Sequence, residues 1–182
     1  IMPAAERVFA RYGFRGTTMQ QIADAADLPK ANLHYYFGNK QTLYLRVLEC
    51  ILHDWLAPLE GISASADPKT ALEEYVRKKI GFSFARPEAS RLFANEILQG
   101  AQVVHPLLKT QLRQLVAEKA RILDGWIALG KLSAMDTTHF FFTVWSMTQT
   151  YADFDIQIAA VLGEDSHSKT AQQRATEHVL RC

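Results

Sequence analysis

The sequence predicts an all-α protein with an N-terminal three-helix unit followed by a larger helical bundle. Apolar residues recur at helical spacing along most of the 182-residue chain. No segment shows the sustained alternation of apolar and polar residues that is typical of half-buried strands. Residues that cap helix starts precede most of the periodic segments. We expect about nine helices, and we expect the chain to divide into domains at residues 1–48 and 49–182.

The first expected helix ends at Gly13. Ala5, Val8, Phe9 and Tyr12 repeat at i, i+3, i+4 and i+7, and glycine is common just past the end of a helix. The apolar side of this helix is therefore expected to pack on the two helices that follow it.

The second and third expected helices are short and are joined by a tight turn. Thr18, followed three residues later by Gln21, matches the capping box of a helix start. Asp27 is expected to cap the third helix, in which Leu33 and Phe37 recur at i and i+4. Two short helices with this spacing form a helix-turn-helix.

Six further helices are expected over residues 39–58, 71–85, 87–100, 105–130, 137–161 and 168–181. Asn39 and Asp136 are expected to cap two of them, and Pro87 occupies a first-turn position. The segment GISASADPK at residues 61–69 is expected to connect the two halves. The segment 137–161 is apolar nearly all round, so we expect it to be buried on two sides, one of them by a second copy of the chain.

The third expected helix displays mainly polar side chains. Apart from its apolar positions it carries Lys30, Ala31, Asn32, His34, Tyr35 and Tyr36. Such groups suit the major groove of DNA, because Asn pairs with adenine, Lys reaches guanine or phosphate, and Tyr contacts a thymine methyl group or a phosphate. On an isolated helix, residues of these types more often belong to an ordinary solvent-exposed surface. Their position after a capped helix and a tight turn is what favours contact with DNA.

The run GFRGTTMQQIADAADLPKANLHYYFGNKQTLY resembles the helix-turn-helix of TetR-type transcriptional regulators. The segments YYFGNKQTLYLRVLE, DWLAPLEGI, EASRLFANEILQGA, LDGWIALGKLSAMD and TQTYADFDIQIAAVLG extend the resemblance over most of the chain, to members of that family that repress pyrimidine utilisation and have a YcdC-like C-terminal region. Pro29 departs from the family pattern, in which a Ser usually stands there, so Asp27 or another group must supply the cap.

The resemblance implies a DNA-contact role for nine residues. Phosphate contacts are implied for Thr17, Thr18, Tyr36 and Lys40, and base contacts for Lys30, Ala31, Asn32, His34 and Tyr35. It further implies a cytoplasmic homodimer, joined through the last two helices, that binds a palindromic double-stranded DNA operator and is released by a small effector, here a pyrimidine base such as uracil or thymine. Two alternatives stay open: a regulator of the same build with a drug or lipid effector, and a helical protein that binds DNA or a ligand without sequence choice.

Polar residues within the C-terminal helices are candidates for effector binding. The five candidates are Arg91, Phe93, Trp145, Gln149 and Tyr151. The amide of Gln149 suits the edge of a pyrimidine, Arg91 can donate to a carbonyl oxygen, and the aromatic rings can stack on the base. The alternative is structural: Arg91 forms an ion pair with Glu96 or Asp153, and Gln149 lines the dimer interface. The pocket itself is expected between the fourth and eighth helices.

Composition sets limits on other classes of function. The net charge is only +1, but the first 49 residues hold six basic against four acidic residues, which makes them the better phosphate-binding segment. The six histidines and two cysteines show no metal-ligand spacing, and neither a glycine-rich phosphate loop nor a nucleophile elbow is present. No apolar run is long enough for a membrane span. We therefore expect no enzyme activity, no metal and no cofactor.

Overall fold

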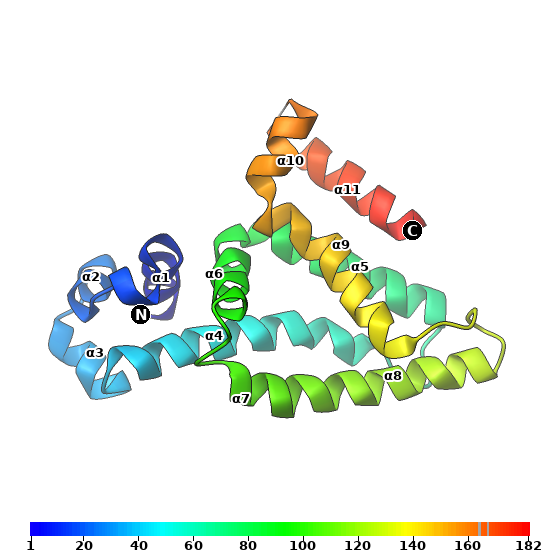
Figure 1. Cartoon of the computed structure of the whole chain (residues 1–182), viewed down its shortest axis with the longest axis horizontal. Helices are drawn as coiled ribbons and strands as arrows, with labels where there is room; N and C mark the ends of the chain where they lie inside the picture. The colour runs from blue at the N-terminus through cyan, green and yellow to red at the C-terminus, as the bar shows by residue number, and fades with distance from the viewer. Residues whose placement is uncertain (164, 167) are drawn as a thin grey trace. The chain divides into compact units, whose positions relative to one another are not determined.

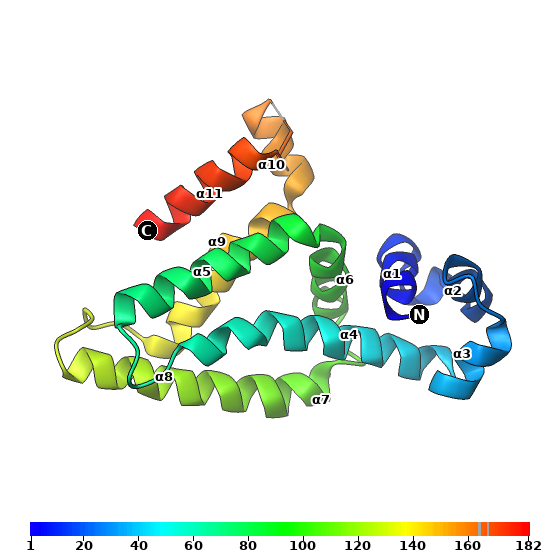
Figure 2. The ribbon, with the colours of Figure 1, turned by 180° about the vertical axis from the view of Figure 1, so that it is seen from behind.

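The computed structural model describes residues 1–163, 165–166 and 168–182 (Figures 1 and 2). These residues form helices and connecting segments without a strand, which confirms the all-α class. None of the helices described is long and apolar enough to cross a membrane. The elements are α1 (Met2–Gly16), α2 (Met19–Ala25), α3 (Lys30–Phe37), α4 (Lys40–Leu56), η1 (Ala57–Gly61), α5 (Pro68–Ala85), α6 (Pro87–Leu98), α7 (His105–Leu107), η2 (Leu108–Leu112), α8 (Arg113–Ala128), α9 (Thr137–Asp153), α10 (Asp155–Leu162) and α11 (Lys169–Arg181).

Packing divides the chain into two units. Unit 1 comprises Ile1–His53 and Glu88–Leu107, and unit 2 comprises Asp54–Pro87 and Leu108–Cys182. Unit 1 therefore contains α1 to α3, most of α4, nearly all of α6, and α7. The domain boundary at residues 48 and 49 stays a prediction, and the packing adds that a later segment of the chain joins the N-terminal helices.

The core of unit 1 holds the three N-terminal helices against the start of α4. Phe9, Ile22 and Leu33, one from each of the first three helices, are fully buried. The ring of Phe9 meets the edge of Tyr44 of α4 at 4.8 Å between centroids. Gly13 ends the regular part of α1 with a φ of +68°, a conformation that glycine adopts without a steric penalty.

The starts of α2 and α3 are stabilised differently. Thr18 and Gln21 form the expected capping box, in which each side chain bonds the backbone of the other residue. The expected cap from Asp27 was wrong, because α3 begins at Lys30 with Pro29 at the N-cap position and without a side-chain cap bond. Asp27 instead adopts a φ of +52° in the turn, a conformation that Asp tolerates better than most residues.

Two expected long helices are each divided. The segment 105–130 forms α7 and α8 with the π-helical turn η2 between them, and the segment 137–161 forms α9 and α10. At the second break the backbone of Phe154 leaves the helical region, with φ −123° and ψ 32°. Asp153 and Asp155 flank Phe154, and Asp is a weak helix former, so the local sequence offers little resistance to a break in the helix at this position.

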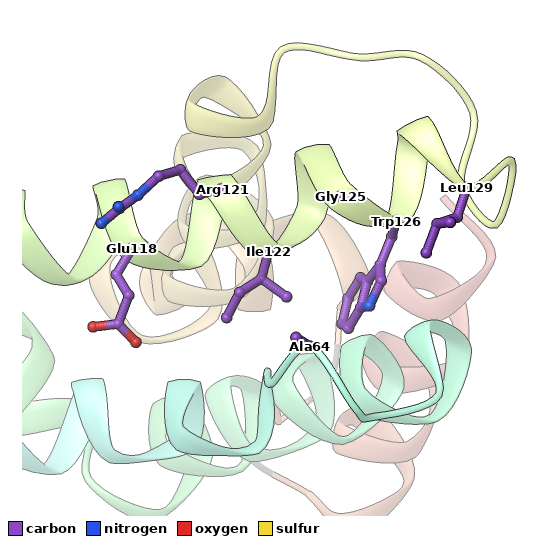
Figure 3. A pocket seen from close by; sticks show the side chains of 7 residues that line it. All are labelled: Ala64, Glu118, Arg121, Ile122, Gly125, Trp126 and Leu129. Carbon is purple, nitrogen blue, oxygen red and sulfur yellow. The ribbon is translucent and has the colours of Figure 1, made fainter.

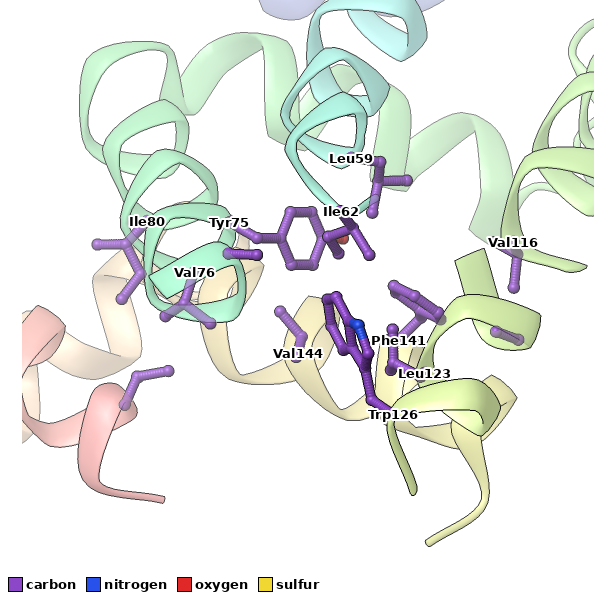
Figure 4. Packing of buried hydrophobic residues seen from close by; sticks show 13 residues of the cluster. Leu59, Ile62, Tyr75, Val76, Ile80, Val116, Leu123, Trp126, Phe141 and Val144 are labelled. Carbon is purple, nitrogen blue, oxygen red and sulfur yellow. The ribbon is translucent and has the colours of Figure 1, made fainter. Parts of the chain in front are cut away.

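Unit 2 is organised around α5, which contacts α9, α11 and η1. Figure 4 shows Tyr75 of α5, Trp126 of α8 and Phe141 of α9 brought together in its core, where each ring is at most 2% exposed. Asp136 caps α9 through bonds from the backbone N–H groups of Thr138 and His139, as expected. This core fixes the inner faces of α5 and α9, on which the polar groups described below lie.

Candidate functional site

The polar side of α3 lies on the surface of unit 1. Tyr35 is 84% exposed and Tyr36 is 67% exposed, whereas Leu33 is fully buried. Lys30, Ala31 and His34 are also exposed, and Asn32 is half-buried. The apolar side of the helix is thus used for packing, and the side with the six predicted groups is available to a partner.

His34 is held in one orientation by the end of its own helix. Its Nδ1 lies 2.9 Å from the carbonyl oxygen of Gly38. A carbonyl oxygen only accepts hydrogen bonds, so Nδ1 must carry the proton and Nε2 of the neutral ring is an acceptor. The rings of Tyr35 and Tyr36 meet edge to face at 5.2 Å, which orders the adjoining surface.

Lys40 and Thr17 make internal bonds in unit 1. The ammonium group of Lys40 donates to the carbonyl oxygens of Phe14 and Thr17, both at 2.8 Å, and lies 4.5 Å from the centre of the Phe14 ring. Thr17 is 1% exposed and its hydroxyl donates to the carbonyl oxygen of Gly13 at 2.7 Å. Both side chains therefore fix the turn between α1 and α2 and the start of α4. Of the four residues that the resemblance assigns to phosphates, only Thr18 and Tyr36 are exposed.

A buried carboxylate ties α4 to α6 within unit 1. The hydroxyl of Tyr44 donates to Glu96 at 3.2 Å, and the backbone N–H of Val103 donates to the other carboxylate oxygen at 2.7 Å. Glu96 is only 7% exposed. Burial and the adjacent carboxylate raise the pKa of Tyr44 well above its ordinary value, so the phenol stays protonated as a donor. This pair was missed from the sequence, because Tyr44 fits an apolar stripe and Glu96 was considered only as an ion-pair partner of Arg91.

The five predicted effector residues are shared between the two units. Arg91 and Phe93 belong to unit 1, where Phe93 is buried and Arg91 is half-buried. Trp145, Gln149 and Tyr151 lie on α9 in unit 2, and all three are half-buried. The structure therefore brings three of the five together on one helix.

The three residues on α9 differ in what they leave available. The indole N–H of Trp145 donates to the hydroxyl of Tyr75 at 2.8 Å, so only its ring faces are left for a ligand. The ring of Tyr151 stacks on Phe84 at 5.7 Å. The amide of Gln149 makes no side-chain hydrogen bond to any residue that the structure describes. The donor and the acceptor of the Gln149 amide are thus open to water or a ligand as far as the described residues are concerned.

Lys79 of α5 was not selected from the sequence, although a lysine within an apolar stripe is a usable signal. Its side chain is 3% exposed, and its ammonium group lies 4.8 Å from the centre of the Trp55 ring. Burial lowers the pKa of Lys79 from its ordinary 10.5 to about 8, while the carboxylate of Asp153 acts in the opposite direction.

A pocket of about 350 Å³ opens on a different part of unit 2 (Figure 3). Its walls come from α8 and from the connection after η1, and they are Ala64, Glu118, Arg121, Ile122, Gly125, Trp126 and Leu129. None of the five predicted effector residues lines it. Within the described residues, no three His, Cys, Asp or Glu side chains lie close enough together to hold a metal ion.

Two families match the chain, one on each side of residue 48. Residues 1–47 match the family described as "Bacterial regulatory proteins, tetR family". Residues 48–182 match "YcdC-like protein, C-terminal region". The two matches together cover the whole chain.

Similar proteins carry the names of transcriptional regulators. The chain is 41% identical to the HTH-type transcriptional regulator RutR of Escherichia coli K12, over all of this chain and 85% of that protein. It is 28% identical to the HTH-type transcriptional repressor NicS of Pseudomonas putida KT2440, over 94% of this chain and 83% of that one. The crystal structure of the regulator SCO4942 from Streptomyces coelicolor matches with a TM-score of 0.74 at 26% identity, covering 99% and 93% of the two chains.

Lys40→Met is expected to destabilise unit 1 as well as to weaken DNA binding. It removes two charge-assisted hydrogen bonds, and bonds of this kind contribute roughly 1.5 to 3 kcal/mol each. Urea unfolding of this variant and of the exposed control Lys69→Met should show a loss of stability only for the first. If Lys40 only contacts a phosphate, Lys40→Met would leave the urea unfolding curve unchanged. It would reduce the slope of log affinity for operator against log salt concentration by about one.

The burial of Lys79 predicts a pH dependence of stability. Below pH 8 both folded and unfolded states hold the proton and the full cost of burying the charge is present. Between pH 8 and 10.5 only the folded state releases the proton, so stability rises with pH. From pH 7.5 to 9.5 the unfolding free energy of the native chain should rise by about 2 kcal/mol relative to Lys79→Met. Parallel pH profiles of the two proteins would contradict this.

Proposed function

Because the chain belongs to the TetR family of bacterial regulatory proteins, we propose that it is a homodimeric repressor released from a palindromic operator by a pyrimidine base. That it is a DNA-binding transcriptional regulator and not an enzyme follows from the family. The dimer, the operator symmetry, the effector and a cytoplasmic location are the proposed parts. The observation that carries the DNA-binding role is the exposed polar side of α3, whose other, apolar side is buried.

In the proposed complex α3 lies in the major groove. Lys30, Asn32, His34 and Tyr35 then face base edges, where Asn32 suits adenine and Lys30 suits guanine. Ala31 suits an apolar contact with a thymine methyl group. Thr18 and Tyr36 are exposed at the flanks and suit phosphates. Thr17 and Lys40 contribute by holding the surrounding backbone, from which N–H groups at helix starts also reach phosphates.

The proposed dimer forms through α9, α10 and α11. Apolar residues on α9 and α10 remain exposed in the single chain: Phe142 at 48%, Phe154 at 57%, Ile156 at 82% and Val161 at 81%. An apolar surface of this kind supports an interface, and the simplest partner is the same surface of a second copy across a two-fold axis. The two copies of α3 must then be about 34 to 36 Å apart to reach successive major grooves.

The proposed effector site lies in unit 2 and includes Gln149 and the ring of Trp145. A pyrimidine carries N–H donors and carbonyl acceptors along one edge, which the unused amide of Gln149 can match. The resemblance to repressors of pyrimidine utilisation supports uracil or thymine as the base. An amphipathic drug or lipid as effector would instead require a longer and more apolar cavity.

The bonds to Glu96 suggest how effector binding reaches the DNA. They join α6 and the turn before α7 to α4, so these segments and α3 belong to one packing unit. The chain passes between the units inside α4, at Pro87, and at η2. An effector that binds unit 2 more tightly in one arrangement would therefore shift unit 1 as a body.

Asn32→Ala is expected to relax operator choice. A bidentate contact to one base provides roughly 1 to 3 kcal/mol of discrimination. Gel-shift titrations of operator and scrambled duplex at one salt concentration should show a smaller affinity ratio for this variant, while the exposed control Asn95→Ala on α6 keeps the native ratio. A native protein with equal affinity for both duplexes would instead favour a non-specific DNA-binding protein.

A nucleobase panel tests the effector. Uracil or thymine should raise the melting temperature of the native protein and release labelled operator, whereas adenine should do neither. Gln149→Ala should lose most of this response, and the exposed control Gln99→Ala should keep it. If no pyrimidine acts, but a drug or fatty acid does, the regulator has a different effector.

A further inference from the structure

Lys79 lacks the partners that a buried lysine requires. Its side chain is 3% exposed, yet its ammonium group makes no hydrogen bond or ion pair with any residue that the structure describes. Its ammonium group also lies over the face of the Trp55 ring, at 4.8 Å from the ring centre. Among the described residues the fully buried side-chain nitrogen or oxygen atom without a partner is Nε1 of Trp126, so Nζ of Lys79 keeps some accessible surface and its three donors are open to water or a ligand.

Lys119 shows what a structural buried lysine looks like in the same unit. It is 7% exposed, similar to Lys79, but its ammonium group donates to the carbonyl oxygen of Ile62 at 3.1 Å and pairs with Glu118 at 3.2 Å. Its bonds attach the connection after η1 to α8. Lys119, which serves packing, therefore has hydrogen-bond and ion-pair partners within the unit. Lys79 differs from it in having none among the described residues.

The helix that packs along α5 carries a second polar side chain without a hydrogen-bond partner among the described residues. Helix α5 packs along α9, which carries Gln149 and, one turn later, Asp153. Asp153 is the charged group that acts on Lys79. Trp145 of the same helix is bonded to Tyr75, one turn before Lys79 on α5. Two facing helices thus supply aromatic surfaces, an amide and an ammonium group.

We propose that Lys79 binds the effector, by donating a hydrogen bond to a carbonyl or anionic oxygen of a planar ligand. The inference rests on the proposed function and adds a chemical requirement to it. The ligand must present an oxygen acceptor to a cation, which excludes drugs that lack such an oxygen. In a pyrimidine this acceptor is one of the two ring carbonyl oxygens, and Gln149 takes the remaining edge.

Uracil binding by calorimetry tests the proposal on the full chain. Lys79→Met keeps the length of the side chain and removes the donors, while Lys78→Met is the matched control, because Lys78 is 56% exposed beside Glu74. We expect Lys79→Met to bind uracil at least tenfold more weakly and Lys78→Met to bind it normally. Operator binding without uracil should be unchanged in both variants.

Thio-substituted bases identify the oxygen. Sulfur accepts hydrogen bonds weakly, so either 2-thiouracil or 4-thiouracil should bind the native protein less tightly than uracil. That difference should disappear in Lys79→Met, because the donor is gone. A difference that persists in the variant would place the sulfur-sensitive contact elsewhere and overturn the proposal.

The remaining outcomes separate this inference from the proposed function. Normal uracil binding by Lys79→Met would overturn the role of Lys79 and leave the pyrimidine effector in place. Absence of binding by the native protein would overturn the pyrimidine effector, and the melting temperature of the free variants would then decide the role of Lys79. If the melting temperature of Lys79→Met is much lower than that of the native protein and Lys78→Met is unaffected, the lysine is a packing residue and the inference is overturned. If the melting temperature of Lys79→Met equals or exceeds that of the native protein, the ammonium donors are not needed for packing and the inference is supported.

Discussion

The placement of α3 depends on the ammonium group of Lys40. Its two bonds to the carbonyl oxygens of Phe14 and Thr17 join the start of α4 to the turn between α1 and α2. Since α3 lies between α2 and α4 in the chain, both of its ends are held by segments that this one group connects. The rings of Phe9, Phe14 and Tyr44 pack at the same junction. A surface that reads DNA requires such rigidity, because base contacts are sensitive to small displacements.

The same unit extends beyond the N-terminal helices through Glu96. A carboxylate with one bond from Tyr44 and another from the backbone of Val103 is well satisfied, although it is nearly buried. Removing either donor would leave part of a buried charge unpaired, which is costly. This arrangement makes α6 a part of the DNA-binding unit in mechanical terms, whereas α5, which precedes it in the chain, belongs to the other unit.

Unit 2 treats its polar groups in two ways. Lys119 and Tyr75 have partners within the unit and serve packing. Lys79 and Gln149 have no hydrogen-bond partner among the residues that the structure describes, and they lie on helices that contact each other. A protein that must bind and release a small ligand needs polar groups that are placed by the fold but not satisfied by it, because only these gain free energy when the ligand arrives.

The sequence by itself determined the helical class, the capping box at Thr18, the caps at Asn39 and Asp136, and the exposed residues of α3, because each depends on local periodicity or on neighbours within one turn. The domain limits and the contacts of individual residues with DNA or ligand stay predictions. Only the tertiary structure decided that Thr17 and Lys40 bond inward, that α9 ends at Phe154, and that Lys79 is nearly buried beside Trp55. These features join residues far apart in the chain, and a pattern of residue types does not specify which distant groups meet.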